Sequence, residues 1–361
     1  MTKTDLIVIG GGAAGLMAGC AAGEAGLRCL IAERKHKPGR KLLACGNGRC
    51  NLTTNVSAKR MIEIYGPPVG SFLESAIRAF DSAALQRWFA ENGLRTAVRK
   101  GSKVYPHTDC AGDVLDCLLD RLRLHGVSLA LSSPVEGVER MRGGFRVATR
   151  NFVVEAPHVL LATGGVSWPK TGSVGDGLDW AKNLGHRVEA PKPGLVCFEA
   201  PHRKSNEPSG KIFEGVIVEI FDGDERVGES RGTYEIRPGS IGGTAISDAS
   251  RIVARRRIER PKLRIRHPDG RTETLGPLRP RPIKEAMVTV GGISLKEIDP
   301  QTMESKIAPC LFFAGEVMDV DGPTGGYNLQ AAFATARLAV AAIAKRPRRT
   351  NARSQNQGKK R

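Results

Sequence analysis

Three glycines and one carboxylate near the N-terminus have the residue types and the spacing of a dinucleotide-binding site. Gly10, Gly12 and Gly15 form the pattern G-x-G-x-x-G, and Glu33 follows the first glycine by 23 residues. The glycines permit a tight turn and let the backbone approach a pyrophosphate, and the acidic side chain accepts hydrogen bonds from ribose hydroxyls. The pattern predicts a site for FAD or NAD and does not distinguish between them.

The elements around these residues have the order that such a site requires. The apolar residues 5–9 are predicted to form a buried parallel strand, residues 16–25 a helix of small residues, and residues 27–32 a second strand that ends at Glu33. The helix N-terminus presents unpaired N–H groups and the positive end of the helix dipole to the phosphates. Strand, glycines, helix, strand and acid in this order are much more specific than the glycines alone.

Three later segments favour FAD. Residues 39–53 combine glycines with basic and small polar residues, which suits a loop around an anionic cofactor. Residues 159–165 are predicted to form a buried strand that ends in glycines. Residues 311–316 are predicted to form another strand, which leads through a glycine-rich turn into a helix over residues 329–344. A chain that begins a nucleotide-binding fold, leaves it and returns at its end has the layout of flavoprotein FAD domains.

Long motifs in these segments carry a family resemblance over about residues 4–190 and 285–344. They are GRKLLACGNGRCNLT, LLATGG followed by SWPKTGSVGDGLDWAKNLGH, and EIDPQTMESKIAPCLFFAGEVMDVDGPTGGYNLQAAFATA. The chain resembles the BaiN/HI0933-like (YhiN) family of FAD-dependent oxidoreductases, within the glutathione-reductase-like flavoprotein class. The resemblance implies bound FAD and an α/β fold, with a Rossmann-like three-layer FAD/NAD(P)-binding domain and an inserted β-rich domain. Family members are assigned to reduction of unsaturated steroid-like ketones and to aminoacetone oxidation, so membership leaves the substrate open.

The motifs and the resemblance together assign a set of positions to the cofactor. The resemblance implies that Val135 contacts the adenine through its backbone, that Gly315 and Glu316 face the ribitol, and that Asn328 opens the last helix beside the flavin ring. A helix N-terminus there would stabilise negative charge on reduced flavin. For Glu316 and Asp319 the alternative is that they are solvated turn carboxylates. The full predicted set is Gly10, Gly12, Ala13, Ala14, Gly15, Glu33, Arg34, Arg40, Lys41, Gly46, Arg49, Cys50, Asn51, Val135, Thr163, Gly164, Gly165, Gly315, Glu316, Asp319, Gly325, Gly326, Asn328 and Leu329.

The order of the segments predicts four parts of the chain. They are the first part of the FAD-binding domain over residues 1–190, a β-rich insert that forms the substrate domain over residues 191–284, the C-terminal return over residues 285–344, and a basic disordered tail over residues 345–361. Within the insert, alternating apolar residues predict a strand over 215–222 with 226–231 as its hairpin partner. The family's helical stretch is shortened here to the Arg-rich residues 251–284, whose prolines argue against long helices. This departure puts any inherited substrate specificity in doubt.

The positive charge of the chain suggests an alternative function that involves anionic partners. There are 55 lysines and arginines against 37 aspartates and glutamates, which gives a formal net charge of +18. A field of this sign attracts anions such as nucleotides, acidic substrates and nucleic acid. The basic block from Arg251 to Arg266 is either a solvated, variable surface or a site that recruits an acidic substrate or RNA. A flavin-bearing RNA-binding or RNA-modifying protein is therefore one alternative, although an aromatic content of 5% argues against a stacking platform for single strands.

Cys45 and Cys50 provide a second alternative. They form a C-x₄-C pair soon after the second predicted strand, where disulfide reductases of the same broad class carry a redox pair, so a dithiol–disulfide oxidoreductase is conceivable. Against it, the family often has a small hydroxyl residue in place of Cys45, whereas Cys50 belongs to the family's ordinary pattern. The C-terminal stretch also has no His–Glu pair, because His267 is the last histidine. The other interpretation is that both cysteines are packed or incidental. No further Cys/His pair has zinc-site spacing, so no metal is predicted.

No catalytic acid or base is assigned from the sequence. His107, Tyr327 and Lys41 are the candidates for proton transfer during hydride exchange, and the alternative for His107 is a loop or packing residue. A second complete G-x-G-x-x-G after a strand is absent, so NAD(P)H is expected only as a transient electron donor. A different electron donor stays open as an alternative, and so does O₂ as the oxidant. The favoured function is an FAD-dependent oxidoreductase whose flavin N5 exchanges hydride with a small or medium organic substrate.

The location of the protein follows from three observations. Eight cysteines in 361 residues do not indicate a disulfide scaffold. No apolar run approaches the roughly 20 residues that span a bilayer. The apolar residues 6–9 run into glycines rather than into a signal-cleavage site. A cytoplasmic protein without membrane association is expected, and its oligomeric state stays open.

Overall fold

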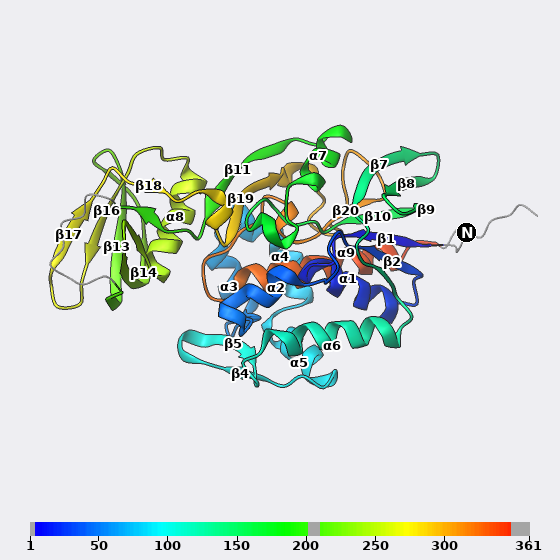
Figure 1. Ribbon diagram of the computed structural model, residues 1–361, viewed down its shortest axis with the longest axis horizontal. Helices are drawn as coiled ribbons and strands as arrows, with labels where there is room; N and C mark the ends of the chain where they lie inside the picture. The colour runs from blue at the N-terminus through cyan, green and yellow to red at the C-terminus, as the bar shows by residue number, and fades with distance from the viewer. Residues whose placement is uncertain (1–3, 201–209, 348–361) are drawn as a thin grey trace, which may run out of the picture.

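Five parallel strands form the central sheet of the computed structural model, which describes residues 4–200 and 210–347 (Figure 1). Their order across the sheet is β20-β10-β1-β2-β6. The strands are β1 (Leu6–Ile9), β2 (Cys29–Ala32), β6 (Ser128–Ala130), β10 (His158–Leu161) and β20 (Leu311–Phe313). All four residues of β1 are buried because both faces of the sheet are covered, which explains their uninterrupted apolar sequence.

Helices cover one face of this sheet, and a second, smaller sheet covers the other (Figure 1). The helical layer contains α1 (Ala13–Glu24), α9 (Tyr327–Ala344) and α6 (Ala111–Leu124), and α1 packs against both of the others. The smaller sheet is antiparallel and consists of β7 (Val135–Met141), β8 (Gly144–Thr149) and β9 (Val153–Ala156). This arrangement confirms the predicted α/β fold with a three-layer, Rossmann-like domain.

The segment between β2 and β6 extends the helical side of this lobe. Its elements are α2 (Arg40–Ala44), β3 (Thr53–Thr54), α3 (Ala58–Tyr65), α4 (Val69–Ala79), α5 (Ser82–Glu91), β4 (Thr96–Val98) and β5 (Lys103–Pro106), and α7 (Asp176–Asn183) follows later in the chain. The side chains of Ser57 and Asp81 cap α3 and α5 by accepting hydrogen bonds from backbone N–H groups of the first turns. Helix α4 packs on α9, so the last helix is buried along most of its length.

The segment between β11 and β19 forms a second lobe, seen on the left of Figure 1. β11 (Val188–Gly194) and β19 (Val288–Ile293) pair antiparallel where the chain leaves and re-enters the larger lobe. Beyond them lies an antiparallel sheet in the order β17-β16-β13-β14-β15-β12-β18. Its strands are β12 (Phe198–Glu199), β13 (Ile212–Asp222), β14 (Glu225–Arg237), β15 (Ser240–Gly242), β16 (Pro261–Arg266), β17 (Thr272–Leu275) and β18 (Arg279–Pro280). Helix α8 (Thr244–Arg256) packs on this sheet on the side of the larger lobe, and the two share a separate hydrophobic core.

The insert differs from the sequence prediction in the position at which its helix begins. The predicted hairpin is present as β13 and β14, which are longer than expected. The prediction that prolines exclude a long helix from residues 251–284 holds, because only residues 251–256 are helical there; the helix itself, α8, begins earlier than predicted, at Thr244. The buried face of α8 begins at Ala245, upstream of the basic block, and Pro261 lies beyond the end of the helix.

The C-terminal part of the chain is described only as far as residue 347. Helix α9 ends at Ala344, and Arg346 forms an ion pair with Glu304. The predicted tail lies outside the described residues from residue 348 onward. Within the part of the chain that the structure describes, no helix is both long and apolar enough to cross a membrane.

Candidate functional site

A cavity of about 760 Å³ opens at the carboxyl ends of the parallel strands and continues to the insert. The residues that follow β1, β2, β10 and β20 line one part of it, and residues of β14 and α8 line another. Ligands of open parallel sheets bind at these carboxyl ends. The cavity therefore joins the predicted nucleotide site to the predicted substrate domain.

The glycine loop after β1 is shaped to approach an anion. Gly10 has a φ of +106°, a conformation that L side chains rarely adopt, and a Cβ on Gly15 would lie 1.8 Å from the carbonyl oxygen of Gly10. Gly12, in contrast, lines the cavity, and a Cβ there would meet no atom within 4 Å. No side chain caps the N-terminus of α1, so its first N–H groups remain available for phosphate oxygens.

The carboxylate of Glu33 is fixed at the wall of the cavity by backbone donors. Its Oε2 accepts a hydrogen bond from the N–H of Gly11 at 2.6 Å, and its Oε1 accepts one from the N–H of Lys35 at 2.8 Å. The side chain is buried, yet each oxygen retains a further lone pair for a ribose hydroxyl. The cations Lys37 and Arg40 also line this part of the cavity, and neither pairs with a carboxylate among residues 4–200 and 210–347. Buried acid, uncapped helix and unpaired cations fit the ribose and pyrophosphate of FAD.

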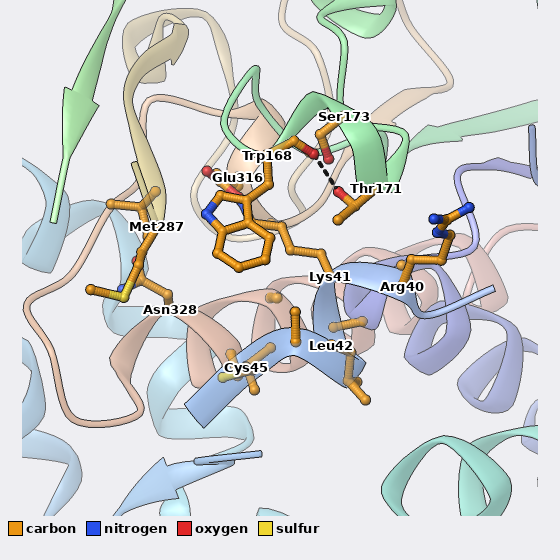
Figure 2. Close-up of a pocket in the computed structure, with 18 of the residues that line it drawn as sticks. Arg40, Lys41, Leu42, Cys45, Trp168, Thr171, Ser173, Met287, Glu316 and Asn328 are labelled. Carbon is orange, nitrogen blue, oxygen red and sulfur yellow. Dashed lines mark hydrogen bonds and ion pairs between the residues drawn. The ribbon is translucent and has the colours of Figure 1, made fainter. Parts of the chain in front are cut away.

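A hydrogen-bonded ion pair joins α2 to the turn after β20. The ammonium of Lys41 donates to Oε2 of Glu316 at 2.6 Å and to Oγ of Ser167 at 2.7 Å, and Ser167 donates to Oε1 of Glu316 at 3.0 Å. The N–H of Thr289 donates to the same Oε1 at 2.6 Å. Glu316 is therefore a held carboxylate and not a solvated one. Figure 2 shows Lys41 on the lower wall of the cavity, opposite Trp168.

The N-terminus of α9 opens into the same cavity. Its N-cap residue, Gly326, has a φ of 102° and provides no side-chain cap. Asn328 and Leu329, in the first turn, line the cavity. The side-chain amide of Asn328 accepts from the N–H of Gly322 at 2.8 Å and donates to its carbonyl oxygen at 2.9 Å, so it anchors the preceding loop. The positive end of a long helix dipole consequently faces the cavity.

One face of α8 joins the insert to the loop that precedes α9. The carboxylate of Asp248 accepts from the N–H and the hydroxyl of Thr324, at 2.7 and 2.9 Å. Further along α8, Arg251 pairs with Asp321, and Arg255 donates to Asp319 at 2.7 Å. Burial raises the pKa of Asp248 to about 6, although the hydrogen bonds from Thr324 oppose this shift. Two arginines of the basic block thus make internal ion pairs, an outcome that neither interpretation of the block anticipated.

Most positions that the sequence assigns to FAD line this cavity. They are Gly10, Gly12, Ala13, Ala14, Glu33, Arg34, Arg40, Lys41, Gly46, Arg49, Asn51, Val135, Thr163, Gly164, Gly315, Glu316, Gly325, Gly326, Asn328 and Leu329. Gly15, Cys50, Gly165 and Asp319 do not line it. Gly15 packs against the glycine loop, Cys50 is fully buried, and Asp319 pairs with Arg255.

The three candidates for proton transfer are not brought together. Lys41 lines the cavity, whereas His107 is exposed away from it and Tyr327 is buried outside it. The ring of Tyr327 meets that of Tyr65 edge to face at 5.7 Å, and burial raises its pKa. Among residues 4–200 and 210–347, no group of three or more His, Cys, Asp and Glu side chains is placed to hold a metal ion.

Sequence reasoning missed several residues of the cavity wall. Trp168 and Met287 are large apolar side chains that are 38% and 46% exposed, and both line the cavity (Figure 2). Lys103 and Tyr105 of β5 and Thr244 of α8 also line it. The motif around Trp168 was part of the resemblance, but nothing in the local spacing of the other residues indicates that they meet the nucleotide-binding elements.

Comparison with known proteins decides the family. Residues 4–342 match the family described as the HI0933-like protein Rossmann domain. The chain belongs to the HI0933-like family. The predicted resemblance is confirmed, and the protein is an FAD-dependent oxidoreductase. The glycine loop and the buried carboxylate of Glu33 fit this cofactor.

Two curated relatives of this HI0933-like protein match nearly end to end. A 3-dehydro-bile acid delta(4,6)-reductase of Clostridium scindens is 27% identical over 409 residues, which cover 94% of this chain and 99% of the relative. A ribosomal RNA dihydrouridine synthase of Escherichia coli is 28% identical over 400 residues, which cover 93% of this chain and 97% of the relative.

Solved structures share the fold of this HI0933-like chain. The 3-ketosteroid-delta4-(5alpha)-dehydrogenase of Rhodococcus jostii RHA1 superposes with a TM-score of 0.57 at 14% identity, covering 95% of this chain and 97% of that one. Escherichia coli quinol fumarate reductase FrdA superposes with a TM-score of 0.57 at 16% identity, covering 95% and 70%. At these identities the likeness is one of fold.

Proposed function

We propose that the enzyme reduces a carbon–carbon double bond that is conjugated to a carbonyl group of a small or medium organic substrate. The names of both curated relatives describe this chemistry. A delta(4,6) double-bond system beside a 3-oxo group is a conjugated ketone, and the bond that is saturated in dihydrouridine is conjugated to a ring carbonyl. Addition of hydride to such a bond is favourable because the carbonyl oxygen accepts the negative charge.

The observation that carries this proposal is the shared wall of the cavity. Nucleotide-binding elements line one part, and Thr233, Thr244 and Ser247 of the insert line another, so a substrate held by the insert can meet the flavin in the same cavity. Trp168 and Met287 add apolar surface for a ring system. Bound FAD supplies hydride transfer, and the chain supplies position and charge.

Residues of the chain have separate tasks in this reaction. Gly12 and the N-terminus of α1 would hold the pyrophosphate, and Glu33 would hold the ribose. The N-terminus of α9 at Asn328 would stabilise the negative charge of the reduced cofactor. Lys41 would donate a hydrogen bond or a proton to the substrate carbonyl, because its ammonium lies on the cavity wall and is held by Glu316.

One experiment tests both the electron donor and the class of unsaturated substrate. NADH or NADPH is added anaerobically to the FAD-loaded enzyme, and bleaching of the flavin bands identifies the donor. The reduced enzyme is then mixed with a conjugated 3-oxo steroid, with uridine, with an RNA that contains uridine, and with a saturated ketone as the control. Return of the flavin bands with one unsaturated compound, together with a product heavier by two hydrogens, supports the proposal. Reoxidation by O₂ but by none of the unsaturated compounds would identify an oxidase instead.

A further inference from the structure

Two cysteines lie at the two ends of a short loop beside the cavity. Cys45 begins the 3₁₀ turn Cys45–Gly48 after α2, and the N–H of Cys50 donates to the carbonyl oxygen of Cys45 at 3.0 Å. This backbone hydrogen bond closes the loop and brings the backbones of the two cysteines together, and each thiol shifts the pKa of the other. Cys50 has a φ of 60°, in the left-handed region that glycine adopts more easily than other residues, so the backbone of the loop is strained at this cysteine.

The two sulfur atoms have different surroundings. Cys45 lines the cavity and lies in Figure 2 between Leu42 and Asn328, below Lys41. Cys50 is fully buried behind it. An attacking sulfur that lines the cavity and a resolving sulfur buried behind it are the parts that a dithiol needs.

The pKa values of the two thiols are also shifted in opposite directions. The neighbouring thiol of Cys50 lowers the pKa of Cys45. Burial opposes this shift, whereas the N–H of Asn51 and the charge of Lys41 add to it. The same interaction and burial raise the pKa of Cys50. Thiolate character is what makes a cysteine nucleophilic, so it concentrates on the sulfur that faces the cavity. Burial instead raises the pKa of Cys197, the other cysteine that lines the cavity.

We propose that Cys45 and Cys50 are a redox-active dithiol that exchanges two electrons with the bound flavin. In the oxidising direction the two S–H bonds break, one S–S bond forms, and the dithiol loses two protons and two electrons. Oxidised flavin accepts both electrons and is reduced. In the opposite direction reduced flavin returns two electrons to the disulfide, which takes up two protons and becomes two thiols. This activity is additional to reduction of the conjugated double bond and does not depend on its substrate.

The number of electrons that each flavin consumes tests the proposal. The FAD-loaded enzyme is oxidised with diamide, freed of the oxidant, and mapped by peptide mass spectrometry for a Cys45–Cys50 disulfide. It is then titrated anaerobically with dithionite until the flavin bands have bleached. The flavin and the disulfide are each two-electron couples, so the wild type should consume twice the reductant per flavin that a flavin alone requires.

Three variants make the outcome specific. Cys45→Ser and Cys50→Ser should each halve the reductant consumed per flavin, whereas Cys197→Ser should leave it unchanged. The titration is normalised to bound flavin, so a partial loss of FAD does not alter the reductant consumed per flavin. Cys45→Ser retains a small polar group at the position. A wild-type enzyme that consumes only one flavin equivalent, or a peptide map without the Cys45–Cys50 disulfide, would overturn the proposal.

Discussion

Arg255 on α8 donates a hydrogen bond to the carboxylate of Asp319 at 2.7 Å, and this ion pair crosses from the insert to the FAD-binding domain. Arg255 also contacts Asp321, which is fully buried and pairs with Arg251. Residues 248, 251 and 255 recur at helical spacing, so one face of α8 makes all of these contacts. The insert is therefore fastened to the loop that leads into α9.

Arg255→Ala should lower the free energy of unfolding by about 2–4 kcal/mol, because it leaves the half-buried carboxylate of Asp319 without its cation and removes one of the two arginines that pair with buried Asp321. Urea denaturation followed by circular dichroism measures the change. The control is Arg231→Ala, whose ion pair with Glu229 is exposed and whose loss should change stability by less than about 0.5 kcal/mol. Equal effects of the two substitutions would contradict the role of Arg255.

Asp248 should make the protein less stable as the pH rises from about 4 to about 6. The folded protein retains the proton of Asp248 up to a pKa of about 6, whereas the unfolded chain releases it near pH 4. The unfolded state thus binds fewer protons in this window, and stability falls as pH increases. Asp248→Asn removes the titration and can still bond to Thr324, so its melting temperature relative to the wild type should be higher at pH 7.5 than at pH 4.5. A difference independent of pH would refute this assignment.

Two glycines of the nucleotide loop should separate cofactor binding from folding. Gly12→Ala should weaken FAD binding by at least about 100-fold, because its methyl group enters the space where the backbone must approach a pyrophosphate. The apoprotein of this variant should unfold like the wild type, since no atom lies within 4 Å of the added carbon. Gly15→Ala should instead destabilise the apoprotein, because its methyl group would meet the backbone of Gly10. FAD titration by fluorescence quenching and thermal denaturation of each apoprotein check both outcomes.

Lys41→Met should slow reoxidation of the reduced enzyme by its substrate about 100-fold, because the cavity loses the group that stabilises charge or supplies a proton. The variant should retain FAD, which visible absorbance measures, and stopped-flow absorbance gives the rate. Lys41→Arg should recover part of the rate, since it keeps a cation opposite Glu316. Lys182→Ala serves as the matched control, because its ion pair with Asp179 lies on an exposed surface. A normal rate in Lys41→Met would exclude Lys41 from the reaction.

The nucleotide-binding half of the fold could be predicted because its signal is local. The strand, the glycines, the helix and Glu33 lie within one short stretch, and each residue is required by the backbone or by the ligand next to it. The insert was harder because its packing is set by tertiary contacts. The sequence places the helical stretch only from residue 251 onward, among arginines and prolines, whereas the buried face of α8 begins at Ala245, before the first of these arginines.

The residues of the cavity wall also divide into those that local motifs predict and those that only long-range packing brings there. Gly12 and Lys41 belong to continuous motifs, and they line the cavity. The sequence assigns Asp319 to the cofactor as part of a family motif, but its partner Arg255 is 64 residues away and no spacing rule connects them. Thr244 reaches the cavity only because α8 docks on the larger lobe. Contacts of this kind arise from long-range packing, which a single sequence does not encode in any short pattern.

The pairing of β11 with β19 has an evolutionary consequence. Because Gly194 lies opposite Val288, the chain leaves the FAD-binding domain and returns to it at neighbouring points. The segment between them is thus a cassette, which can be lengthened, shortened or exchanged without moving the strands that surround the cofactor. Under the proposed function, substrate range can diversify through this cassette while the flavin chemistry is inherited unchanged.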